Sequence, residues 1–265
     1  MPPSNPTQTQ PAQTRLTEED LPARGPAATT HAFVYTNRYF IGTYLLFLLP
    51  AAGLLYFYPL GELELALNLR RTSWADLLFT FGTLFGEWPA YVALLGVLIY
   101  FISYRSALML PLIGLFAGVF SGLLKLFFSH ARPTTWFWEQ GLYSQLNIFD
   151  DSTYPSIVYT SFPSGHSASA FALYGFVAFS ISRYRGLGAL LAFLAIQVAF
   201  SRIYLLMHFL EDVMVGSLLG LLIALGCYYL QFRIFPHKTW LDDSLYRRRT
   251  RRIEGIDGLP PVDQV

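Results

Sequence analysis

The stretch EDVMVGSLLGLLIALGCYYLQF, residues 211–232, decides the fold. After its first two residues it is free of charge, and a run of about 18 or more apolar residues without charge is typical of a membrane-spanning helix. Working outward from it, we find five further segments of similar character. The sequence therefore predicts transmembrane helices at residues 39–58, 88–104, 106–128, 164–181, 186–204 and 211–232.

The composition agrees with a membrane protein. Hydrophobic residues make up 54% of the 265 residues and charged residues only 13%, about half of the roughly 25% that is usual in soluble domains. A net charge of +1 without a broad basic face argues against a nucleic-acid-binding protein. Cys227 is the only cysteine, which excludes an internal disulfide, and we interpret it as a packing residue.

Outside the spans the chain divides into a few simple parts. Residues 1–30 are rich in Pro, Gln and Thr and predict a disordered tail without a cleaved signal. Residues 31–235 form the predicted membrane domain, and residues 236–265 a basic C-terminal tail. Between the first two spans, residues 62–87 are amphipathic. They predict one or two short interfacial helices, with a core-packed connector as the alternative.

The distribution of Lys and Arg predicts the orientation, because cytoplasmic loops carry an excess of both. With both termini cytoplasmic, most of the 18 basic residues lie inside, and we interpret the run at residues 247–252 as retention charge. The inside set is Arg15, Arg24, Arg38, Arg105, Arg183, Arg185, Arg233, Lys238, Arg247, Arg248, Arg249, Arg251 and Arg252. The outside then keeps Arg70, Arg71, Lys125, Arg132 and Arg202.

Two of the outside cations lie near the end of the third predicted span. Lys125 is inside the span and Arg132 follows seven residues later, about two helical turns, so both can share one face if the helix continues. Ionisable groups in membrane helices are costly and indicate function. The alternative is that Lys125 extends to the lipid headgroups and Arg132 is an ordinary interfacial cation.

The sequence FPSGHS, residues 162–167, lies where the fourth predicted span begins. Ser164 is a good N-cap, and Gly165 lets an oxyanion approach the backbone closely. Free amides and the helix dipole make such an N-terminus an anion site. His166 adds a titratable group there. A plain helix cap with an interfacial histidine is the alternative.

Arg202, His208 and Asp212 form a third cluster, before and at the start of the last span. His208 and Asp212 are four residues apart and share a helical face. A carboxylate in this position can accept an imidazole N–H, fix the tautomer and leave the other nitrogen as a nucleophile. The alternative is a buried pair that only joins two helices. Glu211 is expected to face elsewhere, in solvent.

All three clusters fall on the same face of the membrane in the predicted topology. Cations, a helix N-terminus, two histidines and an orienting carboxylate together indicate a phosphate site, because phosphoryl transfer depends on positioning and electrostatic stabilisation. The cluster contains a single carboxylate, Asp212, too few for the usual Mg²⁺ site. We therefore expect no metal and no other cofactor.

The three clusters resemble the signatures of the type 2 phosphatidic acid phosphatase (PAP2) family, whose superfamily includes glucose-6-phosphatase and the vanadium haloperoxidases. The matching residues are Lys125-x6-Arg132-Pro133, Pro163-Ser164-Gly165-His166 and Ser201-Arg202-x5-His208-x3-Asp212. The resemblance covers about residues 60–232 and leaves both tails outside. It implies an all-α integral membrane protein, a PAP2-type bundle of six transmembrane helices.

The resemblance also implies residue roles. His208 would attack phosphorus and form a phosphohistidine, Asp212 would orient it, and His166 would protonate the leaving group. The phosphoryl oxygens would be held by Lys125, Arg132, Arg202, Ser164 and the Gly165 amide. No metal would be needed.

The implied function is hydrolysis of a lipid phosphate monoester or diphosphate at the outer face of a plasma membrane, such as a bacterial inner membrane. Candidate substrates are undecaprenyl diphosphate, phosphatidylglycerol phosphate, phosphatidate and the lipid A phosphates. A lipid phosphotransferase and a non-catalytic phosphate-binding membrane protein are the alternatives. The expected partners are the lipid and the bilayer, with the oligomeric state open. Aromatic residues before the fourth span would grip lipid chains or form an interfacial belt: Trp136, Phe137, Trp138, Tyr143 and Tyr154.

Overall fold

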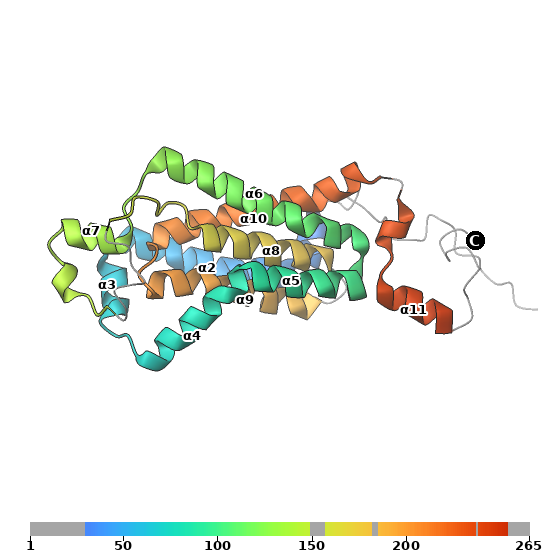
Figure 1. The fold of residues 1–265 in the computed structure, drawn as a ribbon. Helices are drawn as coiled ribbons and strands as arrows, with labels where there is room; N and C mark the ends of the chain where they lie inside the picture. Colours follow the sequence, from blue (N-terminus) through green and yellow to red (C-terminus); the bar gives the residue numbers. More distant parts are fainter. Residues whose placement is uncertain (1–29, 149–156, 182–184, 237, 254–265) are drawn as a thin grey trace, which may run out of the picture.

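The computed structural model describes residues 30–148, 157–181, 185–236 and 238–253, and all the regular elements in these ranges are helices (Figure 1). Of the tail predicted at residues 1–30, all but Thr30, the first residue of α1, lies outside the described residues, as does Tyr154. The long elements are α2 (Arg38–Phe57), α5 (Trp88–Val97), α6 (Tyr104–Phe128), α8 (Gly165–Ser180), α9 (Arg185–Tyr204) and α10 (Leu210–Ile234). A π-helical turn, Leu98–Ile102, extends α5. Each predicted span coincides with one of these elements.

Not all of these helices are long and apolar enough to count as membrane spans. Within the described residues, four stretches are long and apolar enough: Arg38–Phe57, Tyr104–Glu139, Gly186–Tyr204 and Leu210–Ile234. A fifth qualifies if Ser73–Gly86 and Trp88–Ile102, bent by 55°, form one span. α8 has 16 residues, a length of about 24 Å, which is shorter than the roughly 30 Å hydrocarbon core. The chain is an all-α integral membrane protein, but the predicted count of six spans is not confirmed.

α8 is the central helix of the bundle. It packs against α6, α9 and α10 (Figure 1), and every residue from Ala170 to Phe179 is buried. A helix that is apolar on all sides is stable only when it is enclosed. The neighbours of α8 therefore fix its position, and with it the position of its first residues.

Two glycines let α10 approach α8 closely. A Cβ atom at Gly216 would lie 2.4 Å from the Ser164 carbonyl oxygen, and one at Gly220 would lie 2.4 Å from the Ala168 carbonyl oxygen. Four residues apart, these glycines share one face of α10, and small residues at this spacing bring membrane helices into backbone contact. They hold the N-terminus of α10 against that of α8.

Replacing Gly220 with alanine is expected to lower stability by about 1–3 kcal/mol, because the methyl group must displace backbone. The measurement is the thermal unfolding midpoint in detergent. Gly226→Ala is the matched control, since a Cβ atom there meets nothing within 4 Å and alanine favours a helix. Equal midpoints for both variants would contradict the proposed close contact.

The connector between α2 and α5 comprises α3 (Glu62–Asn68), α4 (Ser73–Thr83) and a 3₁₀ turn, η2 (Leu84–Gly86). Its polar face is buried: Arg71 forms an ion pair with Asp76 at 2.8 Å. Its apolar residues Leu77, Leu78 and Phe81 are exposed. The connector is thus core-packed on its charged side and presents an apolar face outward, which combines the two predicted alternatives.

The basic segment after α10 is folded against the bundle. A 3₁₀ turn, η6 (Thr239–Asp242), and α11 (Leu245–Ile253) lie at the opposite end from α3 and from α7 (Pro133–Glu139) (Figure 1). Arg105 Nε lies 2.6 Å from Asp242 Oδ1, and Arg247 donates to the Ile102 carbonyl at 2.9 Å. Some of the arginines interpreted as retention charge therefore also fasten this segment.

The start of the described chain lies at this same end. Phe33 in α1 (Thr30–Thr36) packs against the rings of Tyr228 and Tyr229 near the C-terminus of α10. The N-termini of α8 and α10 lie at the other end, where the three sequence clusters meet.

Candidate active site

The N-termini of α8 and α10 are joined directly. The Ser164 N–H donates to the Asp212 carbonyl at 2.9 Å, and the Ser164 hydroxyl caps α8 by accepting the Ser167 N–H at 3.3 Å. This contact, beside Gly216, places His166 in the first turn of α8 next to the first turn of α10. The predicted second and third clusters therefore lie side by side.

His208 lies in the turn between α9 and α10 and is buried. Its N–H and that of Met207 both donate to the Arg202 carbonyl, at 3.1 and 2.9 Å, which closes the turn. The imidazole Nδ1 lies 3.3 Å from Asp212 Oδ2, whereas no described group hydrogen-bonds Nε2. This arrangement favours the tautomer with the proton on Nδ1 and a free lone pair on Nε2.

Burial lowers the pKa of His208 to about 4, although Asp212 acts in the opposite direction. A neutral imidazole is therefore present throughout the neutral pH range. Neutrality is what a nucleophilic nitrogen requires.

Asp212 is fully buried and its Oδ2 atom accepts several hydrogen bonds. Besides facing His208, Oδ2 accepts the Phe209 N–H at 2.9 Å and the hydroxyl of Ser161. Ser161 Oγ also lies 3.4 Å from His208 Nδ1. These donors fix the carboxylate and stabilise its charge. Ser161 was not predicted, because a serine in a long connection carries no signal of its own.

The three predicted cations gather at this same end. Lys125 lies within electrostatic range of Arg132, Arg202 and Asp212. Its Nζ donates to the Thr160 carbonyl at 2.8 Å, and Arg202 Nη1 donates to Thr83 Oγ1 at 2.8 Å. These contacts direct the cations of separate elements toward one region.

Arg132 reaches the site by a different route from the one considered in the sequence. α6 ends at Phe128, and Ser129 adopts a φ of 46°, so the helix does not continue to Arg132. Instead the Arg132 N–H donates to the Val158 carbonyl at 2.9 Å. Its guanidinium remains protonated, as guanidinium groups do in proteins.

His166 has a carboxylate partner that was not predicted. Its Nε2 lies 3.1 Å from Oε1 of Glu87, which precedes α5, and each side chain is about one-third exposed. The sequence places Glu87 only at the end of an amphipathic segment, 79 residues from His166, so spacing gave no indication. A carboxylate at this distance stabilises the protonated imidazole.

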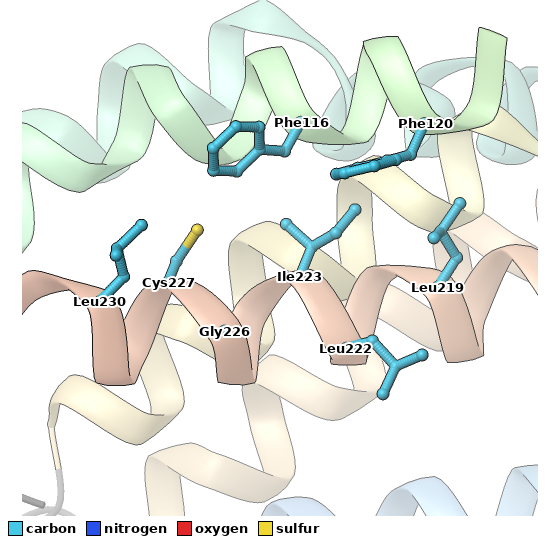
Figure 2. Close-up of a pocket in the computed structure, with 8 residues that line it drawn as sticks. All are labelled: Phe116, Phe120, Leu219, Leu222, Ile223, Gly226, Cys227 and Leu230. Carbon is cyan, nitrogen blue, oxygen red and sulfur yellow. The ribbon is translucent and has the colours of Figure 1, made fainter. Parts of the chain in front are cut away.

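An apolar cavity lies away from this cluster. It has a volume of ≈ 410 Å³ and lies between α6 and α10, midway along the helices. Figure 2 shows Phe116 and Phe120 of α6 facing Ile223 and Cys227 of α10. A cavity lined in this way suits hydrocarbon, whereas the polar chemistry is confined to the end of the bundle.

An all-helical membrane bundle with a buried His–Asp pair, a second histidine and three cations at one end defines a membrane phosphatase. The chain belongs to the PAP2 superfamily, which matches residues 91–236. It is therefore a membrane lipid phosphatase, a phosphoric ester hydrolase.

The solved structures that resemble this chain include the following two crystal structures. LpxE from Aquifex aeolicus is 28% identical with a TM-score of 0.52, over 63% of this chain and 92% of LpxE. The first transmembrane PAP2 type phosphatidylglycerolphosphate phosphatase from Bacillus subtilis is 24% identical with a TM-score of 0.52. That likeness covers 74% of this chain and 96% of the Bacillus protein, and it shows a shared fold.

Proposed function

We propose that the chain is a metal-independent phosphatase that hydrolyses a lipid phosphate monoester or diphosphate through a phosphohistidine on His208. One observation carries the proposal. Asp212 holds Nδ1 of the neutral His208 ring, which leaves Nε2 available within electrostatic range of Arg202 and Lys125. A free imidazole nitrogen beside fixed cations is suited to attack a phosphoryl group.

In the first step, the Nε2 lone pair of His208 forms a bond to phosphorus while the bond from phosphorus to the leaving oxygen breaks. The leaving oxygen takes a proton from His166, so that the lipid departs as an alcohol or a lower phosphate. Asp212 accepts the Nδ1–H of His208 and stabilises the positive charge that develops on the ring. Burial lowers the pKa of His166 to about 4, and Glu87 acts in the opposite direction by favouring the protonated form that donates this proton.

In the second step, water attacks phosphorus and the P–N bond breaks, which returns the lone pair to His208. His166, now neutral, takes a proton from the water. The products are inorganic phosphate and the dephosphorylated lipid. The two steps together consume one water and regenerate both histidines.

The phosphoryl oxygens are held by Lys125, Arg132, Arg202 and the start of α8. The Gly165 N–H is one of the amides that a helix N-terminus leaves without an intrahelical partner. A Cβ atom at Gly165 would meet only Ser121 Oγ, at 3.5 Å, so protein packing alone does not demand glycine here. Close approach of an oxyanion to the backbone is the reason that we assign to it.

The proposed setting is a plasma membrane, such as a bacterial inner membrane, with both termini cytoplasmic and the site on the outer face. The excess of Lys and Arg at the end that holds Arg38, Arg105 and Arg233 supports this orientation. We also propose that the chain consists of a tail at residues 1–30, a membrane domain at residues 31–235 and a basic C-terminal tail at residues 236–265.

The acid limb of the pH profile is expected near pH 4. Only the neutral form of His208 attacks phosphorus, and burial lowers its pKa from 6.5 to about 4. Activity should therefore persist as the pH falls to about 5 and decline as the ring becomes protonated below that value. The measurement is kcat/KM against pH, corrected for ionisation of the substrate. An acid limb centred near pH 6.5 would contradict this assignment.

Replacing Glu87 with glutamine is expected to lower kcat about tenfold and to move the alkaline limb to lower pH. The amide keeps the shape of the side chain but no longer stabilises protonated His166, whose proton is needed by the leaving group. The measurement is kcat against pH for both proteins. Glu62→Gln serves as the control, since Glu62 is an exposed residue of α3. A pH profile identical to that of the wild type would remove Glu87 from the reaction.

A substrate screen tests the proposed function. Purified protein in EDTA is supplied with undecaprenyl diphosphate, phosphatidylglycerol phosphate, phosphatidate and lipid A, and phosphate release is measured. We expect release from at least one lipid by the wild type, and the ranking identifies the substrate. Activity that depends on an added divalent cation would contradict the metal-independent mechanism.

A further inference from the structure

Three potential metal ligands meet beside the proposed nucleophile. His130 follows the end of α6, whereas Glu211 and Asp212 lie in the first turn of α10. One ligand atom from each residue lies within 4.8 Å of the other two, and His130 Nδ1 is 3.8 Å from Glu211 Oε1. From the sequence, Asp212 was the only carboxylate predicted in this cluster. The fold adds a second carboxylate and an imidazole.

Asp212 provides an independent indication of a ligand. Its Oδ2 atom accepts the hydrogen bonds described above, but its buried Oδ1 atom has no hydrogen-bond partner within the described residues. A buried carboxylate oxygen without a partner is costly. A cation bound to Oδ1 would remove that cost. The His130 and Glu211 side chains are 49% and 36% exposed, so an ion can reach them from solvent.

The electrostatic surroundings contain both signs of charge. Glu64 is a further acidic neighbour, and Asp212 and Glu211 both act on it electrostatically. Lys125 and Arg132 act on Asp212 with the opposite sign. A cation attracted only by long-range electrostatic forces would gain little binding energy where charges of both signs surround the site. A metal that forms strong bonds to imidazole and carboxylate would still bind.

We propose that His130, Glu211 and Asp212 bind one divalent transition-metal ion of the Zn²⁺ type, and that this ion inhibits the phosphatase. Zn²⁺ takes imidazole nitrogen and carboxylate oxygen at about 2.0–2.2 Å in tetrahedral sites, which places ligand atoms about 3.3–3.6 Å apart. The ligand atoms of His130 and Glu211 need to close by a few tenths of an ångström, and the full set, whose atoms lie within 4.8 Å of one another, by at most about 1.5 Å. Mg²⁺ prefers six oxygen ligands and is expected to bind poorly.

Inhibition rests on the proposed function, whereas binding of the metal does not. Asp212 must accept the Nδ1–H of His208 for Nε2 to act as nucleophile. A bound metal ion withdraws negative charge from the carboxylate, which weakens this acceptor and the stabilisation of positive charge on the ring. The ion therefore reduces kcat without blocking the cationic phosphate site.

The binding half is tested with Co²⁺, whose visible absorption reports tetrahedral coordination, on substrate-free wild-type protein in detergent. We expect one saturable site per chain, lost in Glu211→Gln and in His130→Ala. Glu139→Gln is the matched control, because Glu139 is an exposed glutamate of α7 outside the cluster, and its binding should equal that of the wild type. Binding that is absent from the wild type, or unchanged in both cluster variants, overturns the site.

The inhibition half is tested by titrating Zn²⁺ into the lipid phosphatase assay. The half-inhibiting concentration should rise at least about tenfold in Glu211→Gln and in His130→Ala, with zinc-free activity and the Glu139→Gln response unchanged. Equal inhibition of all variants, or activation by Zn²⁺, overturns the inhibitory role. If no lipid phosphate is hydrolysed by any variant while Co²⁺ still binds, the proposed function fails and the metal site stands.

Discussion

Replacing His208 with alanine is expected to lower kcat by about 10⁵-fold or more, to the level of the uncatalysed reaction within the assay limit. Loss of a nucleophile in a catalytic unit that acts through a covalent intermediate removes the whole pathway, and such losses reach about 10⁶-fold in hydrolases. The measurement is phosphate release from a saturating lipid phosphate in EDTA. Because Lys125, Arg132 and Arg202 remain in place in this variant, its affinity for the lipid should be nearly unchanged.

The control for this variant is His31→Ala, because His31 is an exposed residue of α1 far from the site. Both variants should keep the wild-type thermal midpoint within a few degrees. If His208→Ala retains more than about 1% of the activity while remaining folded, His208 is not the nucleophile.

Replacing Asp212 with asparagine is expected to lower kcat by about 10⁴-fold with little change in KM. The amide nitrogen can donate to His208 Nδ1, which puts the ring proton on Nε2 and removes the nucleophilic lone pair; the analogous change in a Ser-His-Asp triad has an effect of this size. The measurement is kcat and KM with one lipid phosphate. Because Oδ2 also accepts the Phe209 N–H, the thermal midpoint must be recorded beside the kinetics.

Glu139→Gln is a matched carboxylate-to-amide control for this change, and its kcat should equal that of the wild type. A loss below tenfold in a folded Asp212→Asn protein would mean that the carboxylate only joins the helices, the structural alternative raised by the sequence. A rise in KM with unchanged kcat would instead place Asp212 in substrate binding.

The helices could be predicted because the composition and length of each segment alone indicate a membrane helix. The long apolar runs predicted at residues 39–58 and 211–232, the second free of charge after its first two residues, coincide with α2 and α10 within two residues at each end. The number of spans was not predictable in this way. α8 is apolar enough to resemble a span, but it has only 16 residues, and those from Ala170 to Phe179 are all buried by neighbouring helices. The sequence of one segment does not show how other helices pack around it.

The proposed site was predictable where the chemistry is concentrated in short motifs. His208 and Asp212 are four residues apart, and the capping residue Ser164 directly precedes a helix. The partners contributed from distant segments were not predictable. Glu87 and His166 are 79 residues apart, and Ser161 and Asp212 are 51 apart. Their contacts arise only from the packing of separate elements.

The approach of α8 and α10 is a further feature that only the structure makes specific. Gly216 and Gly220 are four residues apart in α10, and Gly226 follows six residues further along, where an added Cβ atom would meet nothing within 4 Å. Composition alone does not distinguish a glycine that another backbone requires from one that is merely tolerated. Contact with the Ser164 and Ala168 carbonyls makes this distinction.

Capture of the covalent intermediate tests the central claim most directly. Wild-type protein is mixed with phosphatidate carrying ³²P, quenched in alkali within one turnover and digested, and the labelled peptide is sequenced. We expect alkali-stable, acid-labile label on His208, and none in His208→Ala. Rapid hydrolysis by the wild type without any labelled protein, or label that persists in His208→Ala, would contradict the phosphohistidine mechanism.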